Sequence, residues 1–191
     1  QNCLFKIDPT LFAGISNLFE LDLSFNILTS LVYRNKSSGD YESVFKHLPN
    51  LLVLFLANNL VTSLKSKSFS FQDNLVYLGL QNNLIHSIDL DCFDNLNLLE
   101  TFNMNNNNAI IRLQNRNKMQ KMLPSLTGLF LANHHTSELI DLFDFSNLKQ
   151  LSLSYSSINA KTIVRIPFDS IETLHMRSVR LKMSSDEINE N

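Results

Sequence analysis

One spacing of leucines around a single asparagine recurs along this chain and limits its fold more than any other feature. The spacing is L-x-x-L-x-L-x-x-N-x-L-x-x-L, where x is any residue. Three copies fit it with small substitutions: Leu18, Leu21, Leu23, Asn26, Leu28 and Leu31; Leu51, Leu54, Leu56, Asn59, Val61 and Leu64; and Leu75, Leu78, Leu80, Asn83, Ile85 and Ile88. Such a repeat accounts for the high content of leucine and asparagine, 34 and 24 residues among 191. Repetition of this kind indicates a fold built by stacking equivalent units.

Looser copies continue to the end of the chain. Copies begin at residues 18, 51, 75, 99, 126, 148 and 171, so the intervals are 33, 24, 24, 27, 22 and 23 residues. The chain also opens within a copy, because Asn2, Leu4 and Ile7 fit N-x-L-x-x-L. We expect one domain over residues 1–191, with a partial repeat over 1–17 and no terminal caps. Terminal repeats normally need a polar cap, so the chain is predicted to be a fragment of a longer protein.

A series of phenylalanines supports the same register. Phe12, Phe69 and Phe93 each lie ten residues after the asparagine position, at Asn2, Asn59 and Asn83. Phe45 lies nineteen residues after Asn26, which is ten plus nine, so the long interval holds nine extra residues between Leu31 and Phe45. Later repeats offer weaker candidates for this series: Met119 or Met122, Phe143 or Phe145, and Ile166 or Phe168.

The Leu-x-Leu spacing has the period of a short strand with both leucines on one side. Stacking the repeats then pairs the strands into a parallel sheet and buries the leucines in one core. The predicted fold is an α/β solenoid, a curved right-handed superhelix with the sheet on its concave face and irregular or short helical segments on its convex face. A leucine-rich α-helical protein fits poorly, because it requires apolar residues at i, i+3, i+4 and i+7.

The asparagine after each strand is predicted to form a ladder through the stack. The ladder residues are Asn26, Asn59, Asn83 and Asn107. A side-chain amide there can donate to and accept from backbone groups that would otherwise be buried and unpaired. His134, Ser156 and Val179 occupy the later positions. We expect the curvature or twist to loosen where the asparagines end, and a substitution at Ser156 to be mild.

The repeat resembles the typical extracellular class of leucine-rich repeats in its 24-residue length, its L-x-x-L-x-L-x-x-N-x-L spacing and its later phenylalanine. Within that class, the irregular lengths, the insertion after Leu31 and the weakening asparagine ladder resemble Toll and Toll-like receptor ectodomains. The resemblance implies pattern recognition in innate immunity. It implies binding of a protein or microbial ligand, receptor dimerisation, and signalling through a cytoplasmic domain outside this chain.

Two other interpretations are open. An adhesion or extracellular-matrix protein would use the same solenoid as a scaffold, and so would an intracellular repeat protein. The receptor interpretation places the chain outside the cell membrane or in the endosomal lumen, or makes it secreted, with membrane contact only through segments absent from this chain. A signal peptide, a membrane span and a Toll/interleukin-receptor domain in the flanking sequence would select it.

Residues beside the strand leucines are predicted to face the open, concave side of the sheet. Most are small or polar. The exceptions are Phe25, Val53, Phe55 and Tyr77, which strands about 5 Å apart would bring into one patch. Exposed apolar surface and aromatic anchors are typical of interfaces, so these four are the candidate ligand-binding residues. Alternatively, they only cover the sheet or contact a neighbouring loop.

The insertion carries an N-glycosylation sequon, Asn35-Lys36-Ser37. Chance can also produce a sequon in a chain with 24 asparagines. Its place in a predicted outward loop favours its use, so Asn35 is the candidate glycosylation site.

Composition argues against several classes of function. The formal net charge is −2, whereas nucleic-acid binding needs a basic patch. No apolar run approaches the length of a membrane span. The sequence has no G-x-S-x-G, H-E-x-x-H or phosphate-loop motif. We therefore predict no enzymatic activity, no cofactor and no metal site.

The cysteines and histidines give weaker indications. Cys3 and Cys92 lie three repeats apart, about 15 Å at one strand spacing per repeat, whereas a disulfide needs Cα atoms within about 7 Å. Cys3 could pair with a residue upstream, and Cys92 is predicted to be a buried free thiol. The pair His134-His135 lies where the asparagine ladder breaks. It has either an ordinary surface role or a structural one in which histidine replaces the ladder asparagine, or a pH-sensing role.

Overall fold

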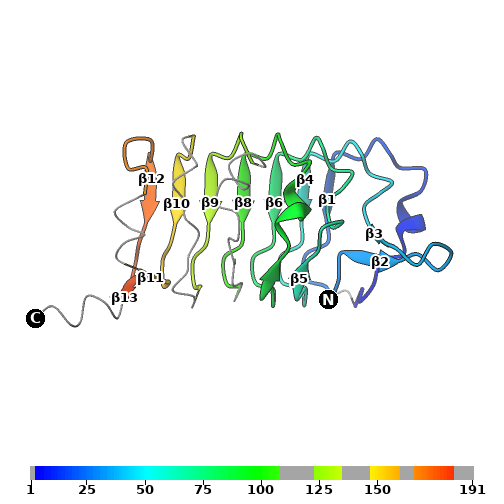
Figure 1. Ribbon diagram of the computed structural model, residues 1–191, viewed down its shortest axis with the longest axis horizontal. Coiled ribbons are helices and arrows are strands. Elements are labelled where there is room, and N and C mark those ends of the chain that lie inside the picture. The colour runs from blue at the N-terminus through cyan, green and yellow to red at the C-terminus, as the bar shows by residue number, and fades with distance from the viewer. Residues whose placement is uncertain (1–2, 108–122, 135–146, 160–165, 183–191) are drawn as a thin grey trace, which may run out of the picture.

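The computed structural model describes residues 3–107, 123–134, 147–159 and 166–182. Its main feature is a seven-stranded parallel sheet. The strands are β1 (Glu20–Asp22), β4 (Val53–Phe55), β6 (Tyr77–Gly79), β8 (Thr101–Asn103), β9 (Gly128–Phe130), β10 (Gln150–Ser152) and β12 (Thr173–His175). They follow one another in sequence order, one from each repeat (Figure 1). The predicted leucine-rich-repeat solenoid is confirmed.

The strands pair in register, so equivalent residues of the repeats stack. Leu54 pairs with Leu21 on one side and with Leu78 on the other. The same pairing continues through Phe102, which lies between Leu78 and Leu129. Because every second residue of a strand faces the same side, these central residues all point into one core. Leu54, Leu78 and Leu129 are completely buried there.

Phenylalanines fill the core on the side opposite the sheet. Phe12, Phe45, Phe69 and Phe93 are all buried. Phe93 meets the sheet directly, with its ring centroid 5.4 Å from that of Phe102. In the repeat that begins at residue 148, this position is occupied by Ile166, which is buried, whereas Phe168 is exposed. The candidates at 119, 122, 143 and 145 lie outside the described residues.

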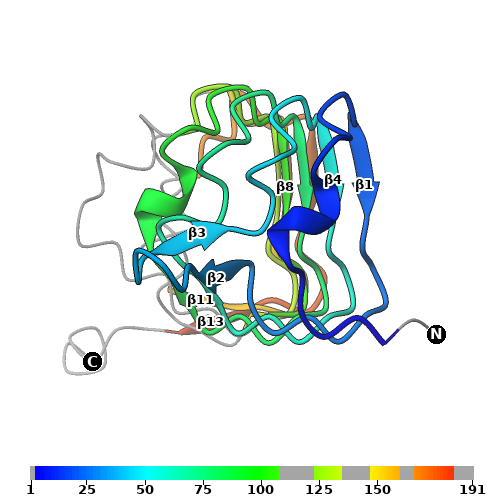
Figure 2. The same cartoon turned by 90° about the vertical axis from the view of Figure 1, so that its right-hand side faces the viewer.

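Short elements form the rest of each turn. Two 3₁₀ helices, η1 (Pro9–Phe12) and η2 (Leu90–Phe93), end at phenylalanines of the core series. Each begins after an aspartate whose carboxylate accepts from a backbone N–H two residues later. β5 (Ser63–Leu64) pairs with β7 (Ser87–Ile88) in a two-stranded parallel sheet, and β11 (Ser157–Asn159) pairs in the same way with β13 (Arg180–Lys182). Figure 2 shows the sheet along one side and η2 on the opposite side.

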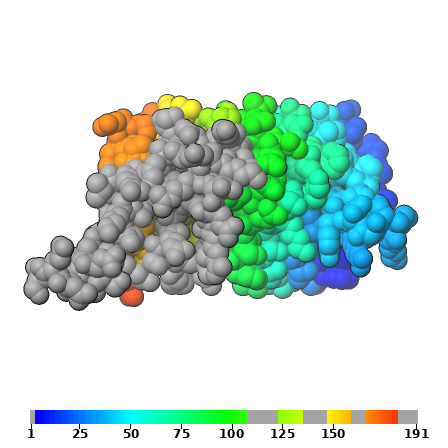
Figure 3. All heavy atoms as spheres, in the orientation of Figure 1, coloured from blue at the N-terminus to red at the C-terminus, as the bar shows by residue number. Residues whose placement is uncertain are grey.

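The insertion after Leu31 is a β-hairpin rather than an irregular loop. Its strands are β2 (Val32–Arg34) and β3 (Tyr41–Ser43), paired antiparallel. At its base, the backbone N–H of Val44 donates to the carbonyl oxygen of Leu31 at 3.1 Å. The hairpin therefore leaves and re-enters the repeat at nearly one point. It projects at the N-terminal end of the stack, on the side away from the sheet (Figures 2 and 3).

Candidate ligand-binding surface

The open face of the sheet carries the first and third residues of each strand. In chain order, these outward positions are Glu20 and Asp22, Val53 and Phe55, Tyr77 and Gly79, Thr101 and Asn103, Gly128 and Phe130, Gln150 and Ser152, and Thr173 and His175. The central residues face the core. Because the loops and helices of the described residues cover only the other side of the sheet, these residues leave this face open along the stack (Figure 2).

Three of the four predicted ligand-binding residues meet on neighbouring strands of this face. Val53 and Phe55 belong to β4, and Tyr77, on β6, pairs with Val53 in the register. The rings of Phe55 and Tyr77 lie with their centroids 5.1 Å apart at an interplanar angle of 50°. This is a favourable distance for an aromatic pair. All three side chains are half-buried, so each keeps part of its apolar surface exposed.

Gly79 makes room for the Tyr77 ring. A Cβ atom at position 79 would lie 3.0 Å from Cε1 of Tyr77 and 3.1 Å from Oε1 of Gln81. Both approaches are closer than ordinary van der Waals contact. The absence of a side chain at Gly79 therefore allows the ring to lean over the backbone of β6 instead of standing away from it.

Phe25, the fourth predicted residue, lies apart from this cluster. Asp22 pairs with Phe55, and Phe25 follows three residues later in the turn after β1. Its side chain is 68% exposed, and among the described residues no ring contact joins it to Phe55 or Tyr77. The patch is therefore formed by Val53, Phe55 and Tyr77, with Phe25 separate from it on the rim.

The backbone of Phe25 is unusual for a bulky residue. Its φ is 58°, in the left-handed region. The same conformation recurs before the ladder position of the later repeats, at Asn58, Asn82, Asn106, Asn133, Tyr155 and Ser178. Asparagine tolerates this conformation, whereas an aromatic residue there is an outlier. Because the conformation recurs in every later repeat, the geometry of the repeat imposes it on Phe25 as well.

Phe130 is a further aromatic residue on this face that the sequence pattern did not single out. It lies on β9 and is half-buried. A Cβ atom at Gly128, two residues earlier, would lie 3.3 Å from Cε2 of Phe130. The arrangement repeats that of Tyr77 and Gly79, with the order of ring and glycine reversed. An aromatic residue two positions from a strand glycine was the signal available in the sequence.

Behind the strands, the four ladder asparagines are buried and hydrogen-bonded to the backbone. Asn59 shows the pattern. Its Oδ1 accepts from the N–H of Leu28 at 3.0 Å, and its Nδ2 donates to the carbonyl oxygens of Leu23 at 3.0 Å and Leu56 at 3.1 Å. Leu23 and Leu28 belong to the preceding repeat. Each asparagine therefore satisfies backbone groups of two consecutive turns, which fixes the bend where the chain leaves the sheet.

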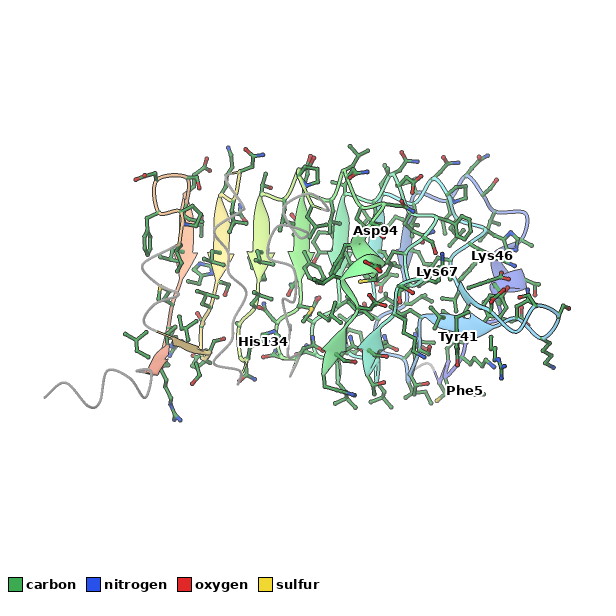
Figure 4. The ribbon with its side chains drawn as sticks, in the orientation of Figure 1. Phe5, Tyr41, Lys46, Lys67, Asp94 and His134 are labelled. Atoms are coloured by element: carbon green, nitrogen blue, oxygen red, sulfur yellow. The ribbon has the colours of Figure 1, made fainter. Side chains whose placement is uncertain are left out.

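The ladder continues beyond Asn107 through His134, in the structural role considered for it, and through Ser156, for which only a mild role was expected. The buried His134 places Nε2 3.0 Å from the carbonyl oxygen of Met104, and because a carbonyl only accepts, Nε2 carries the proton (Figure 4). Ser156 is also buried. Its hydroxyl donates to the carbonyl oxygen of Leu131 at 3.0 Å and accepts from the N–H of His134 at 3.1 Å. Val179 has no polar side-chain atom, so the ladder ends at Ser156 within the described residues.

Asn35 directly follows β2, inside a polar network at the turn end of the hairpin. Its Nδ2 donates to Oε1 of Glu42 at 2.6 Å, and its Oδ1 accepts from the N–H of Ser37 at 2.9 Å. The other carboxylate oxygen of Glu42 accepts from the Tyr33 hydroxyl at 2.6 Å and from Lys46 Nζ at 2.9 Å. These hydrogen bonds, with that from Tyr33 the strongest, lower the pKa of Glu42 from 4.5 to about 2. Nδ2 has a second hydrogen that this network does not use.

The remaining reactive groups do not form a metal centre in the part of the chain that the structure describes. Cys3 is exposed and Cys92 buried, and both are free thiols. Burial raises the pKa of the Cys92 thiol. Within the described ranges, no group of three or more His, Cys, Asp and Glu side chains could hold a metal ion. Nor does any helix among these residues have the length and apolarity needed to span a membrane.

The family model for the leucine-rich repeat matches two stretches of the chain, residues 34–85 and 54–110. A comparison with curated proteins finds no match. Solved structures give broader coverage. Drosophila Toll, in its complex with Spatzle, is 26% identical over 95% of this chain, with a TM-score of 0.75.

Two other structures share the fold at lower identity. TLR13, in its complex with ssRNA13, is 20% identical over 95% of this chain, with a TM-score of 0.74. An internalin from Listeria monocytogenes is 20% identical over 92% of it, with a TM-score of 0.69. The chain spans 25% of the Toll chain, 24% of the TLR13 chain and 46% of the internalin chain. The chain therefore folds as a leucine-rich-repeat solenoid, and its repeats resemble those of Toll and the Toll-like receptors.

Proposed function

We propose that this chain is a ligand-recognition part of a Toll-like pattern-recognition receptor ectodomain acting in innate immunity, and that it binds a protein or microbial ligand through the open face of its sheet. The observation that carries this proposal is the ring pair of Phe55 and Tyr77, 5.1 Å apart on a mostly polar face. Aromatic side chains that keep exposed surface are favoured anchors of interfaces. Val53 extends the patch on the same strand.

The structural similarity to Toll supports a receptor function for this chain. Toll is described in a complex with Spatzle that acts in Drosophila development and innate immunity. By extension, we place this chain on the extracellular side of the cell membrane or in the endosomal lumen. Ligand binding would promote dimerisation, and signalling would use a domain outside this chain. The repeats act as a binding module without catalysis.

The variant Phe55→Ser/Tyr77→Ser tests the binding face. The intact protein, labelled with a fluorophore, is applied to an array of secreted proteins and microbial glycolipids, and each interaction is then measured by titration. Truncating interface anchors typically costs about 2 kcal/mol or more, roughly thirtyfold in affinity. We expect at least that loss for every ligand of the wild-type protein. Unchanged affinities in the variant would contradict the proposal.

Thr173→Ala is the matched control. Thr173 is exposed on the same face, four strands beyond β6 in the sheet order. Its truncation is expected to leave ligand affinity and melting temperature unchanged. The aromatic variant is also compared with wild type by thermal melting. A variant that binds poorly but melts normally locates the defect on the binding face.

Glycosylation of Asn35 tests the extracellular placement. A glycan joins Nδ2, which donates one hydrogen to Glu42 and keeps another for the linkage. We expect protein secreted from a eukaryotic host to show a mass excess that a glycosidase or Asn35→Gln removes. A secreted product without this excess counts against the use of the sequon.

An adhesion or extracellular-matrix protein is the alternative function, and it would use the same surface. The two functions differ in the consequence of ligand binding. A chimaera that joins the intact ectodomain to a reporter domain activated by dimerisation distinguishes them. We expect ligand to activate the reporter, whereas binding with no activation would favour adhesion.

A further inference from the structure

We infer that the partner of the open face is a basic, apolar protein segment, in which a Lys or Arg side chain lies two residues from an apolar one along an extended backbone. This inference rests on the proposed function of the face and adds the chemistry of its ligand. The structural feature behind it is the juxtaposition of two carboxylates with the patch formed by Val53, Phe55 and Tyr77.

The carboxylates are those of Glu20 and Asp22. Both are exposed outward residues of β1, which pairs with β4. Glu20 lies beside Val53 and Asp22 beside Phe55 in the register. Neighbouring strands are about 4.8 Å apart. One edge of the apolar patch is therefore lined along its whole length by negative charge.

No cation of the described residues neutralises these two groups. Within the part of the chain that the structure describes, neither forms an ion pair, and the Asp22 carboxylate accepts only a hydrogen bond from the N–H of Ser24. The outward positions of the seven-stranded sheet, all within the described residues, contain no Lys or Arg. Arg177, just after β12, is separated from β1 by six strand spacings, about 29 Å. This is beyond the Debye length of about 8 Å at physiological ionic strength.

The distance between the two carboxylates and the apolar patch suits an extended peptide that crosses the strands. Side chains two residues apart on a strand lie on one side, about 6.8 Å from each other. The distance from β1 is about 4.8 Å to β4 and about 9.6 Å to β6. A cation at Glu20 and Asp22 thus places the apolar side chain between Phe55 and Tyr77. The methylene stem of the Lys or Arg can pack on Val53.

The same arrangement disfavours an anionic ligand. A phosphate backbone laid over Phe55 and Tyr77 would bring its charges beside two carboxylates, and like charges across an interface oppose association. Stacking of nucleobases on the rings would have to overcome this repulsion without any Lys or Arg at the outward positions of the sheet. The open face therefore selects a basic protein segment over a nucleic acid.

Three labelled peptides test this selection by fluorescence anisotropy on the intact protein. They consist of repeats of Lys-Ser-Leu-Ser, Gln-Ser-Leu-Ser or Glu-Ser-Leu-Ser, so that only the charge beside leucine changes. We expect the affinity to fall in that order, with the lysine peptide about tenfold tighter than the glutamate peptide at low salt. The preference is expected to shrink as salt screens the charges. Single-stranded RNA is expected not to displace the lysine peptide.

Glu20→Gln/Asp22→Asn isolates the carboxylates. Both side chains are exposed, and the amide that Asp22→Asn introduces retains an oxygen that can accept from the N–H of Ser24, so the fold is unaffected. We expect this variant to bind the lysine and glutamine peptides equally. Glu100→Gln is the control, because Glu100 is exposed but precedes the first outward residue of β8. It is expected to keep the wild-type preference.

The outcomes separate this inference from the proposed function. If Phe55→Ser/Tyr77→Ser binds all three peptides as tightly as wild type, the peptides do not use the aromatic patch and both ideas fail. If that variant loses all three while wild type binds the lysine and glutamate peptides equally, the binding face stands and the basic partner is wrong. Displacement of the lysine peptide by RNA would likewise overturn the basic partner.

Discussion

The side-chain Nδ2 of Asn83 donates a hydrogen bond to the carbonyl oxygen of Leu56, one repeat upstream, at 2.9 Å. It also donates to the carbonyl oxygen of Leu80 in its own repeat at 2.9 Å, and its Oδ1 accepts from the N–H of Val61 at 3.0 Å. One buried amide thus joins two consecutive turns of the solenoid. The open face keeps its shape because such contacts fix the turn after each strand from β1 to β10.

Replacing Asn83 with alanine leaves these buried backbone groups without hydrogen-bond partners. We expect Asn83→Ala to lower the free energy of unfolding by about 1–3 kcal/mol, the usual cost of leaving buried polar groups unpaired. Denaturant unfolding of the intact protein measures it. Asn97→Ala, at an exposed position, is the control and is expected to change stability by less than about 0.5 kcal/mol. Equal effects of the two substitutions would contradict the ladder.

Ser156 makes a similar contribution with a shorter side chain. Its hydroxyl is buried and bridges the carbonyl oxygen of Leu131 and the N–H of His134. We therefore expect Ser156→Ala to cost about 1–3 kcal/mol in unfolding free energy, in place of the mild effect expected from sequence. Ser16→Ala, at an exposed serine, provides the comparison. If the two serine variants melt alike, Ser156 is not part of the ladder.

The strained turn at Phe25 predicts a gain in stability on substitution. Phe25 has a φ of 58° and is 68% exposed. Its backbone conformation therefore destabilises the fold, and the ring buries too little surface to offset that cost. Left-handed backbone costs most residues roughly 1–2 kcal/mol, and asparagine less. We expect Phe25→Asn to raise the unfolding free energy by about 1 kcal/mol, and Asn58→Phe to lower it. A loss of stability in Phe25→Asn would show that the ring has a structural role.

Tyr33 is the main cause of the low pKa of Glu42. We expect Tyr33→Phe to raise that pKa from about 2 towards 4.5, as followed by NMR titration of the Glu42 carboxyl. Because the folded-state pKa is depressed, the network stabilises the hairpin above about pH 4.5 and loses this effect as pH falls towards 2. Glu42→Gln is expected to abolish this pH dependence. A wild-type pKa near 4.5 would mean that the network does not form in solution.

Periodicity is why much of the fold could be read from the sequence. Leu54 and Leu78 occupy equivalent places in successive repeats, and that equivalence specifies one register for a parallel stack. The hairpin could not be predicted in this way, because it contains the nine residues between Leu31 and Phe45 that belong to no repeat. Its antiparallel pairing depends instead on contacts within the insertion, such as that between Tyr33 and Glu42.

The candidate site was also only partly predictable, because the repeat pattern describes the strands but not every contact around them. Alternation within the strand places Phe55 and Tyr77 on the open face, but it carries no information about the turn, so it grouped Phe25 with them. A repeat template also recognises asparagine by identity. It therefore missed that Ser156 makes an equivalent hydrogen bond with a hydroxyl group, as His134 does with a ring nitrogen.

The rings of Phe55 and Tyr77 themselves offer the most direct test of the binding face. The intact protein is prepared with ¹³C-labelled phenylalanine and tyrosine rings, and its NMR spectrum is recorded while the tightest of the three peptides is added. The ring signals are assigned with the single variants Phe55→Ser and Tyr77→Ser. We predict that the signals of Phe55 and Tyr77 shift and saturate together, while that of Tyr41, on the hairpin, stays in place (Figure 4). Saturable shifts at Tyr41 with none at Phe55 and Tyr77 would contradict the account, because the ligand would then bind away from the sheet.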